Sequence, residues 1–226
     1  MVTGLARMPR LDVDLLRELP RTGPTDPIEF YRRPLVGRLF RRRIDLGLAL
    51  LGDRRFGSAL EIGYGAGAVL SALASVVDDL HGIDLDADAD AIGKRLAGRG
   101  VSARLVRGSV YELPYPDAHF DLVVSFSVFE HLHQYVDGLR EVSRVLKPSG
   151  SFLLGMPSVN RFMELSFRAI GFKGIEDHHV TTPRQVASRF ETAGFRLVAT
   201  SPLRLPGGLR LYHNWLLQRR AESASM

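Results

Sequence analysis

Apolar residues follow two different spacings along the middle of the chain. Over residues 57–156, short apolar runs alternate with stretches in which apolar residues recur every three or four positions. The first spacing predicts strands and the second predicts amphipathic helices. The expected strands are 58–62, 80–85, 102–106, 120–126 and 151–156, and the expected helices are 66–77, 87–97 and 136–146. Strands separated by helices indicate a doubly wound sheet of parallel strands.

The end of the chain follows a different plan. Residues 183–193 have helical spacing, and two strand-like runs, 195–201 and 209–217, are separated by Pro206-Gly207-Gly208. A short turn can join only antiparallel neighbours. We therefore expect an α/β fold with a Rossmann-like sheet of seven strands, mostly parallel with an antiparallel last strand. Residues 157–180 fit neither spacing and are expected to form a lid-like insertion.

Residues 1–56 are expected to form a helical N-terminal arm or cap, and residues 57–226 the main domain. The arm contains a short helical pattern at 11–19 and a longer one at 35–51, which Pro34 can begin. Arginines fill the positions between the apolar residues of the longer pattern. Such a helix could lie on an anionic membrane, or it could pack over the mouth of a site with its arginines in water. We favour the second interpretation.

The positive charge of the chain is concentrated in this arm. The net charge is +5, and residues 1–56 hold 12 arginines and 7 acidic residues, whereas the remainder holds 18 of each sign. A neutral main domain argues against a nucleic-acid partner. The absence of cysteine excludes disulfides, thiol nucleophiles and cysteine-based zinc sites. No apolar run resembles a signal core or a membrane span, so we expect a cytoplasmic protein.

A glycine-rich turn follows the first expected strand and opens a helix. Gly63, Gly65 and Gly67 allow the backbone to turn tightly, and the helix N-terminus offers N–H groups to a carboxylate or a phosphate. The turn also fits a dinucleotide-binding pattern, with Asp84 placed 21 residues after Gly63. Two features argue against a dinucleotide-binding protein. Glu61 ends a strand that is normally apolar in such proteins, and the antiparallel pair at the end of the chain is not part of their standard sheet.

Five motifs in chain order are more specific than this turn alone. They are Glu61, Gly63, Gly65 and Gly67; Gly82-Ile83-Asp84-Leu85-Asp86; Leu113-Pro114-Tyr115-Pro116-Asp117 with Phe120-Asp121; Val128-Phe129-Glu130-His131-Leu132; and Arg144-Val145-Leu146-Lys147-Pro148-Ser149-Gly150. In this order and spacing, residues 57–156 resemble the class I S-adenosylmethionine-dependent methyltransferases. Residues 179–195 resemble the C-terminal helix and strand of the subgroup that methylates small molecules in quinone, lipid and natural-product biosynthesis.

The resemblance implies S-adenosylmethionine as cofactor and assigns it a set of contacts. The implied positions are Glu61, Gly63, Tyr64, Gly65, Gly67, Asp84, Leu85, Ser109, Val110 and Ser125. The glycines would face the methionine part, Asp84 the ribose hydroxyls and Leu85 the adenine. The family often has an aspartate where Ser109 stands, and a serine can accept only a neutral, weaker hydrogen bond from the adenine amino group.

The resemblance implies an in-line displacement at the sulfonium methyl, so a general base is needed only if the acceptor must lose a proton. His131 and His179 are the candidate bases, with His178 beside the second. The alternative for His131 is that Glu130-His131 only orients its loop. His178 and His179 lie near Glu176 and Asp177, which could suggest metal ligands, but adjacent loop histidines are more typical of surface groups, and we expect no metal.

The sequence therefore predicts methyl transfer to a small, hydrophobic or amphipathic acceptor. Three alternatives stay open at this point: an NAD(P)-dependent oxidoreductase, a catalytically silent cofactor-binding protein, and an RNA methyltransferase that uses the arginine-rich arm. The segment Ser125-Phe126-Ser127 disfavours the last, because it stands where enzymes that methylate base amino groups carry an Asn-Pro-Pro-Tyr-like sequence. Neither the acceptor nor the oligomeric state follows from the sequence.

Overall fold

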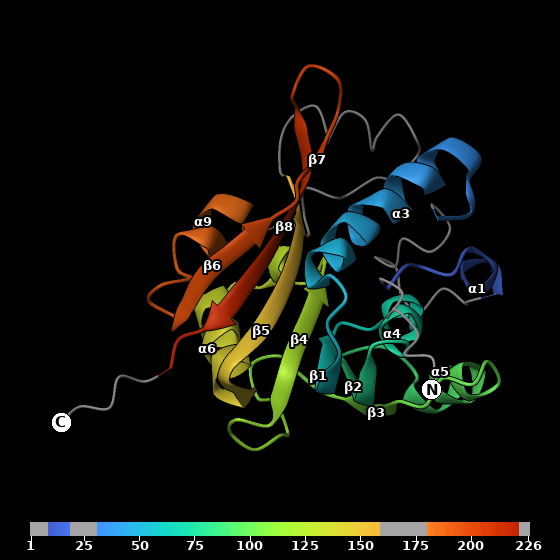
Figure 1. The fold of residues 1–226 in the computed structure, drawn as a ribbon, viewed down its shortest axis with the longest axis horizontal. Coiled ribbons are helices and arrows are strands. Elements are labelled where there is room, and N and C mark those ends of the chain that lie inside the picture. Colours follow the sequence, from blue (N-terminus) through green and yellow to red (C-terminus); the bar gives the residue numbers. More distant parts are fainter. Residues whose placement is uncertain (1–8, 19–30, 159–179, 222–226) are drawn as a thin grey trace.

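A computed structural model describes residues 9–18, 31–158 and 180–221, which form an α/β sandwich around one sheet (Figure 1). Seven strands run in the order β3-β2-β1-β4-β5-β8-β6, and an eighth, β7, pairs only with β8. The strands are β1 (Phe56–Ile62), β2 (Val77–Asp84), β3 (Arg104–Arg107), β4 (Phe120–Phe126), β5 (Leu146–Pro157), β6 (Phe195–Thr200), β7 (Leu203–Arg204) and β8 (Arg210–Arg219). β8 is antiparallel to both β5 and β6, and the pairs from β3 to β5 are parallel. The predicted Rossmann-like sheet is confirmed, with the two-residue β7 as an addition.

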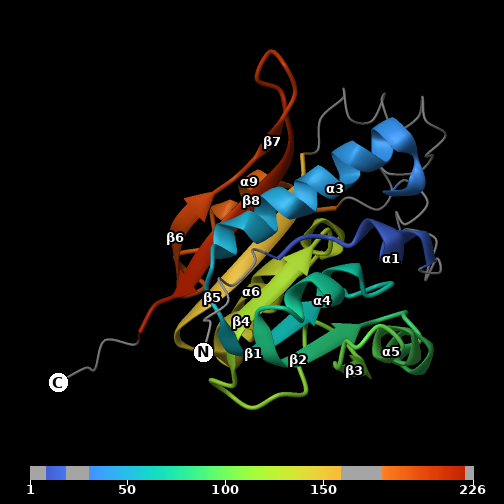
Figure 2. The same cartoon turned by 45° about the vertical axis from the view of Figure 1, so that its right-hand side comes forward.

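Helices cover both faces of the sheet (Figure 2). They are α1 (Val13–Glu18), α3 (Pro34–Leu48) with the 3-10 turn η1 (Ala49–Leu51), α4 (Ala68–Leu73), α5 (Ala89–Ala97), the 3-10 turn η2 (Phe129–His131), α6 (Tyr135–Val145) and α9 (Pro183–Ala187). Buried residues of α3, α4 and α5 share one hydrophobic cluster, and those of α6 and α9 share the other. The sheet therefore lies between two apolar layers, as a doubly wound fold requires.

Two predicted helices are shorter than their apolar spacing suggested. The helix expected at 66–77 ends at Leu73, because the β-branched Val76 and Val77 enter the strand layer, where the Phe56 N–H donates to the Val76 carbonyl at 2.8 Å. The helix expected at 183–193 ends at Ala187. Beyond it, hydroxyl groups bond to backbone carbonyls, as in the 2.7 Å contact from Ser188 to Gln185, and such bonds compete with helical ones.

Two further expectations concern residues 146–180. β5 begins at Leu146 rather than at residue 151, and its register with β4 shifts between Phe120 and Leu122. Most of the expected insertion at 157–180 lies outside the described residues. In the described ranges, no helix combines the length and the apolar character that crossing a bilayer requires.

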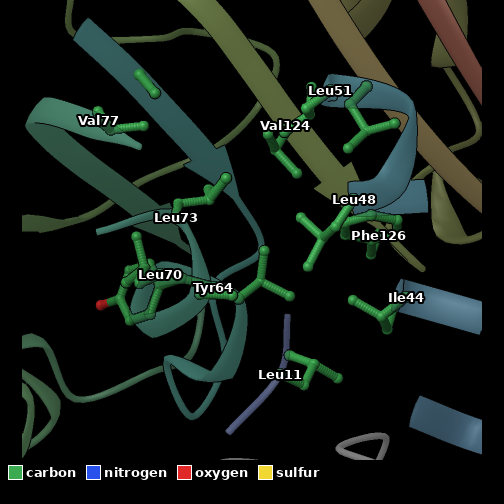
Figure 3. Packing of buried hydrophobic residues seen from close by; sticks show 14 of the residues in the cluster. Leu11, Ile44, Leu48, Leu51, Tyr64, Leu70, Leu73, Val77, Val124 and Phe126 are labelled. Carbon is green, nitrogen blue, oxygen red and sulfur yellow. The ribbon is translucent and has the colours of Figure 1, made fainter. Parts of the chain in front are cut away.

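Helix α3 packs directly on the sheet through a glycine on its buried face. Phe40, Ile44 and Leu48 repeat at four-residue intervals and are all buried. A Cβ placed on Gly47 would lie 2.7 Å from the Phe126 ring and 2.8 Å from Asn214 Oδ1. Figure 3 shows Leu48 beside Phe126 in this contact. Gly47 therefore sets the depth at which α3 sits.

The fully buried Asn214 of β8 fastens this helix at a second point. Its Nδ2 donates to the Arg43 carbonyl and to the Ser201 carbonyl, both at 2.9 Å. The backbone of α3 is thus joined to the last strand by a side chain that the solvent does not reach. A hydrogen bond in such a place is costly to lose, because the buried groups would stay unsatisfied.

We expect Gly47→Ala to destabilise the protein by about 1–3 kcal/mol, since the new methyl group overpacks the contact with Phe126 and Asn214. Gly93→Ala is the matched control, because it also adds a methyl to a helical glycine but meets only Leu105 Cδ1, at 4.0 Å. The control should be neutral or gain up to about 1 kcal/mol from helix propensity. Urea unfolding of both variants checks this, and equal stabilities would contradict the close seating of α3.

Candidate functional site

The glycine turn after β1 adopts a conformation that side chains rarely reach. Gly63, Gly65 and Gly67 have φ values of +75°, +48° and +85°. A Cβ on Gly63 would lie 2.3 Å from Val128 Cγ2. The glycine turn therefore packs directly on Val128, in the loop that follows β4. Tyr64 has its ring in the core and contributes to the turn through its carbonyl, which accepts the Gly67 N–H at 2.8 Å.

Asp84, at the end of β2, holds the turn in place. Its Oδ2 accepts the Gly65 N–H at 2.8 Å, and its Oδ1 accepts the N–H groups of Asp86 and Ala87 at 2.9 and 3.0 Å. A carboxylate offers roughly four acceptor positions, so about one is left for a ribose hydroxyl. The neighbouring Leu85 is 60% exposed, an apolar surface where the adenine is expected to pack. Both residues fit the implied cofactor.

Two predicted site residues carry buried polar atoms that no described residue satisfies. Glu61 is 3% exposed and its Oε2 has no partner, and the Oγ of the fully buried Ser125 has none either. Burial, and then the charge of Asp84, raise the pKa of Glu61 well above its usual value and favour its neutral form. Since buried polar groups are normally satisfied, these atoms fit a site that receives a polar ligand.

The expected adenine end of the site is built from the loop after β3. The Gly108 N–H donates to the Asp84 carbonyl at 2.9 Å, which places the loop beside the end of β2. Ser109 Oγ accepts the Tyr111 N–H at 3.2 Å, so part of its accepting capacity serves its own turn. Val110 is buried in the hydrophobic cluster beneath. The serine that replaces the family's aspartate therefore has little to offer an adenine beyond one neutral contact.

A polar cluster that the sequence interpretation missed adjoins the glycine turn. Ser127 follows β4 with φ +58°, and its Oγ lies 2.8 Å from the Tyr212 hydroxyl. Arg43 of α3 donates from Nη1 to Ser127 Oγ at 3.3 Å and from Nη2 to the Tyr31 hydroxyl at 3.1 Å. We call Arg43, Tyr31, Ser127 and Tyr212 the arginine cluster. It lies next to the turn because Val128, the residue after Ser127, contacts Gly63.

The position of Arg43 corrects the expectation that the arginines of this helix all lie in water. Arg38 and Arg42 are exposed, whereas Arg43 points toward the end of β4. A signal was present in the sequence, because Arg43 stands three residues after Phe40 and four before Gly47, on the stripe that packs against the sheet. An arginine on the apolar stripe of a helix indicates a buried contact.

The turn η2 brings Glu130 and His131 to the same edge of the sheet. Glu130 is 1% exposed, its Oε2 has no partner among the described residues, and burial raises its pKa to about 8. The His131 side chain is 34% exposed, with Nε2 4.0 Å from Glu130 Oε1. The other candidate bases, His178 and His179, lie outside the described residues. The place of Glu130 in the motif Val128-Phe129-Glu130-His131-Leu132 does not by itself predict that its carboxyl is a buried acid–base group.

We expect Glu130→Gln to gain stability relative to the wild type as the pH rises from about 5 to about 8. The unfolded wild-type chain releases the Glu130 proton near its usual pKa of 4.5, whereas the folded chain holds it until about 8. Wild-type stability therefore falls with rising pH in this window, by up to about 1.4 kcal/mol per pH unit for this one group.

The free energy of unfolding in urea, measured at intervals across that window, provides the check. Only the difference between the two proteins is used, so that Glu61, whose pKa is also raised, cancels. A difference that stays constant with pH would show that Glu130 is ionised in the folded protein.

Comparison with known proteins places this site in a family. A family model described as a methyltransferase domain matches residues 60–154. The chain is 30% identical over 141 residues to the methyltransferase YdaC of Bacillus subtilis, an alignment that covers 56% of this chain and 77% of YdaC. A probable S-adenosylmethionine-dependent methyltransferase of Mycolicibacterium smegmatis is 32% identical over 141 residues, covering 62% of this chain and 52% of that protein.

Another relative has a named substrate, and a solved structure shares the fold. A demethylmenaquinone methyltransferase of Staphylococcus aureus is 32% identical over 103 residues, covering 44% of this chain and 43% of that one. Apart from YdaC, the chain thus spans about half the length of these relatives or less. The YcgJ structure of B. subtilis superposes with a TM-score of 0.63 at 18% identity, covering 80% of this chain and 99% of YcgJ. The glycine turn, its acidic neighbours and these matches together show that the chain belongs to the class I S-adenosylmethionine-dependent methyltransferases.

Proposed function

We propose that this protein transfers a methyl group from S-adenosylmethionine to a small amphipathic acceptor by in-line displacement. The acceptor would bind between α3 and the carboxyl ends of β4 and β5. The observation that carries the proposal is the arginine cluster, which is polar, lies among aromatic rings, and adjoins the glycine turn through Val128. The S. aureus relative is named for the methylation of a small molecule, demethylmenaquinone.

The walls of the proposed acceptor site are aromatic. A Cβ on Gly155 of β5 would lie 2.3 Å from the Phe126 ring and 2.8 Å from the Tyr212 ring, so both rings lie over the end of β5. The Tyr31 and Phe40 rings meet edge to face at 5.8 Å on the side of α3. Small-molecule sites typically combine such apolar walls with a few placed polar groups. This combination supports an acceptor with an apolar body and a polar end.

S-adenosylmethionine, when bound, supplies the methyl group on a sulfonium that makes it electrophilic. The protein supplies position and electrostatics. The glycine turn leaves its backbone open to the methionine part, Asp84 keeps about one acceptor position for the ribose, and Leu85 offers an apolar surface to the adenine. Alignment of the acceptor atom with the methyl group can contribute about 7–11 kcal/mol in the best intramolecular cases.

A hydroxyl acceptor would also have to lose a proton. Two groups on η2 can take it: His131 at Nε2, and Glu130 at its buried Oε2 in the fraction of molecules in which this carboxyl is ionised. A pKa of about 8 brings Glu130 within reach of physiological pH, as general acid–base catalysis requires. We propose that one of these two groups serves as the base when the acceptor needs one.

The N-terminal arm is proposed to form one wall of the acceptor site rather than a membrane anchor. Its apolar residues Phe40, Ile44 and Leu48 are buried against the sheet, so they present no apolar face to a bilayer. The same helix delivers Arg43 to the arginine cluster.

Titration calorimetry should show binding of S-adenosylmethionine and no comparable heat from NADH. A carboxyl group such as Glu61 at the end of β1 is not typical of dinucleotide-binding proteins. Binding of NADH alone would overturn the proposed function. Release of S-adenosylhomocysteine in the presence of a panel of lipid, quinone and polyketide acceptors then separates an enzyme from a catalytically silent cofactor-binding protein.

Gly63→Ala should weaken S-adenosylmethionine binding by at least about 10-fold, because the added methyl group collides with Val128 and shifts the turn. Gly100→Ala is the matched control, since Gly100 has the same φ of +75° but nothing within 4 Å of its Cβ position. Both variants should lose about 1–2 kcal/mol of stability from backbone strain. Calorimetry measures the affinity of each variant for S-adenosylmethionine. Equal affinities would show that the turn around Gly63 does not contribute to the cofactor site.

A further inference from the structure

Arg43 is a cation held among aromatic rings with part of its hydrogen-bonding capacity unused. Its guanidinium carbon lies 4.7 Å from the Phe40 ring centre, 5.0 Å from that of Tyr212 and 5.8 Å from that of Tyr31. Two of its five N–H donors bond to hydroxyl groups, and the buried Nε has no partner among the described residues. The N–H groups that do not bond to these hydroxyls are the part of the guanidinium that remains for a ligand.

No carboxylate of the described chain neutralises this charge. The ion pairs found among the described residues do not include Arg43. The nearby acid is Glu130, whose buried carboxyl has a pKa of about 8 and is therefore mostly neutral at pH 7. Tyr31, Tyr212 and Ser127 offer only neutral hydroxyls. The arginine cluster therefore contains a cation for which the described residues provide no paired anion.

A half-buried arginine without a counter-ion is expensive to keep for stability alone, because aromatic rings and neutral hydroxyls compensate the desolvation of its charge only in part. Functional sites commonly retain such costly groups. Arg43 also lies beside the proposed acceptor site, since its partner Ser127 is followed by Val128, which contacts Gly63 of the glycine turn. The arrangement therefore has the position, the charge and the free donors to bind an anion beside the proposed methyl donor.

We infer that the acceptor carries an anionic oxygen group, such as a carboxylate, which the edge of the Arg43 guanidinium binds. The planar fork of an arginine matches the two oxygens of one carboxylate, a paired geometry that two separate hydroxyl groups do not provide. The rings around the cluster would take the apolar body of the same molecule. This inference rests on the proposed function, because it places the anion in the acceptor site of that reaction.

Benzoate and benzamide are suitable probes, because they share shape and ring and differ in charge. Each is titrated by calorimetry into the full chain saturated with S-adenosylhomocysteine, for the wild type, Arg43→Met and Arg42→Met. Arg42 is the neighbouring exposed arginine of the same helix and serves as the matched control. The wild type and R42M should prefer benzoate over benzamide by at least about 10-fold, and R43M should lose this preference, since charged hydrogen bonds to a guanidinium are strong.

Stability separates a binding role from a structural one. If Arg43 serves ligand binding, R43M should unfold at the same temperature as the wild type or a higher one, and benzoate should raise the unfolding temperature of the wild type and R42M only. A lower unfolding temperature for R43M together with an unchanged benzoate preference would assign Arg43 to the fold and overturn the inference.

S-adenosylhomocysteine binding is measured first in every protein. Its absence from the wild type would reject the proposed function, whereas its presence without a benzoate preference in the wild type would reject only the inference about Arg43. If R43M alone fails to bind S-adenosylhomocysteine, Arg43→Gln replaces it with the same criterion. A benzoate preference that survives in R43Q overturns the inference.

Discussion

The contact between Gly63 and Val128 joins the two halves of this site, and the rest of the arrangement depends on it. A side chain at residue 63 would lie 2.3 Å from Val128 Cγ2, so only a glycine lets the cofactor turn and the loop after β4 meet. Parallel pairing brings the two loops to the same edge, since Ile62 lies opposite Ser125 in the register of β1 and β4. Because β1 and β4 are adjacent parallel strands, the residues that would hold the cofactor lie next to those that would hold the acceptor.

The sequence predicted those parts of the protein that depend on local spacing. The order of strands and helices, the glycine turn and Asp84 all follow from patterns within about 30 residues, which is the scale of one strand–helix–strand unit. The lengths of two helices were wrong because valines 76 and 77, and the hydroxyl residues after Ala187, favour other backbone conformations. The position of Arg43 on the apolar stripe indicated a buried contact, but its partners Ser127 and Asn214 could not be identified, because they are 84 and 171 residues away. Contacts of that separation are decided by how α3 seats on the sheet, which no local pattern encodes.

The site edge also holds buried polar groups that have no partner among the described residues. Glu61, Ser125 and Glu130 each keep a buried oxygen without a described partner, and burial raises the pKa of both carboxyls. Away from this edge, charged groups are paired in the usual way, as in the 2.8 Å contact from Lys147 to Asp121, which also holds Ser58. Buried polar atoms without a described partner also occur elsewhere, as at His81 and the Tyr115 hydroxyl, but Glu61, Ser125 and Glu130 lie together on neighbouring strands and loops, where one ligand could satisfy them.

The charges of the proposed reactants bear on why an uncompensated arginine is tolerable here. The sulfonium of S-adenosylmethionine is a cation, and in the proposed complex Arg43 would be a second cation near it, so each would raise the free energy of the other. Neutral Glu130 does nothing to reduce that repulsion. An anionic acceptor placed between them is attracted by both, which couples its binding favourably to that of the cofactor, and by linkage the cofactor to it. Repulsion between the two cations would weaken cofactor binding when no acceptor is present. A negatively charged acceptor would relieve this repulsion, so the site would prefer it to a neutral one.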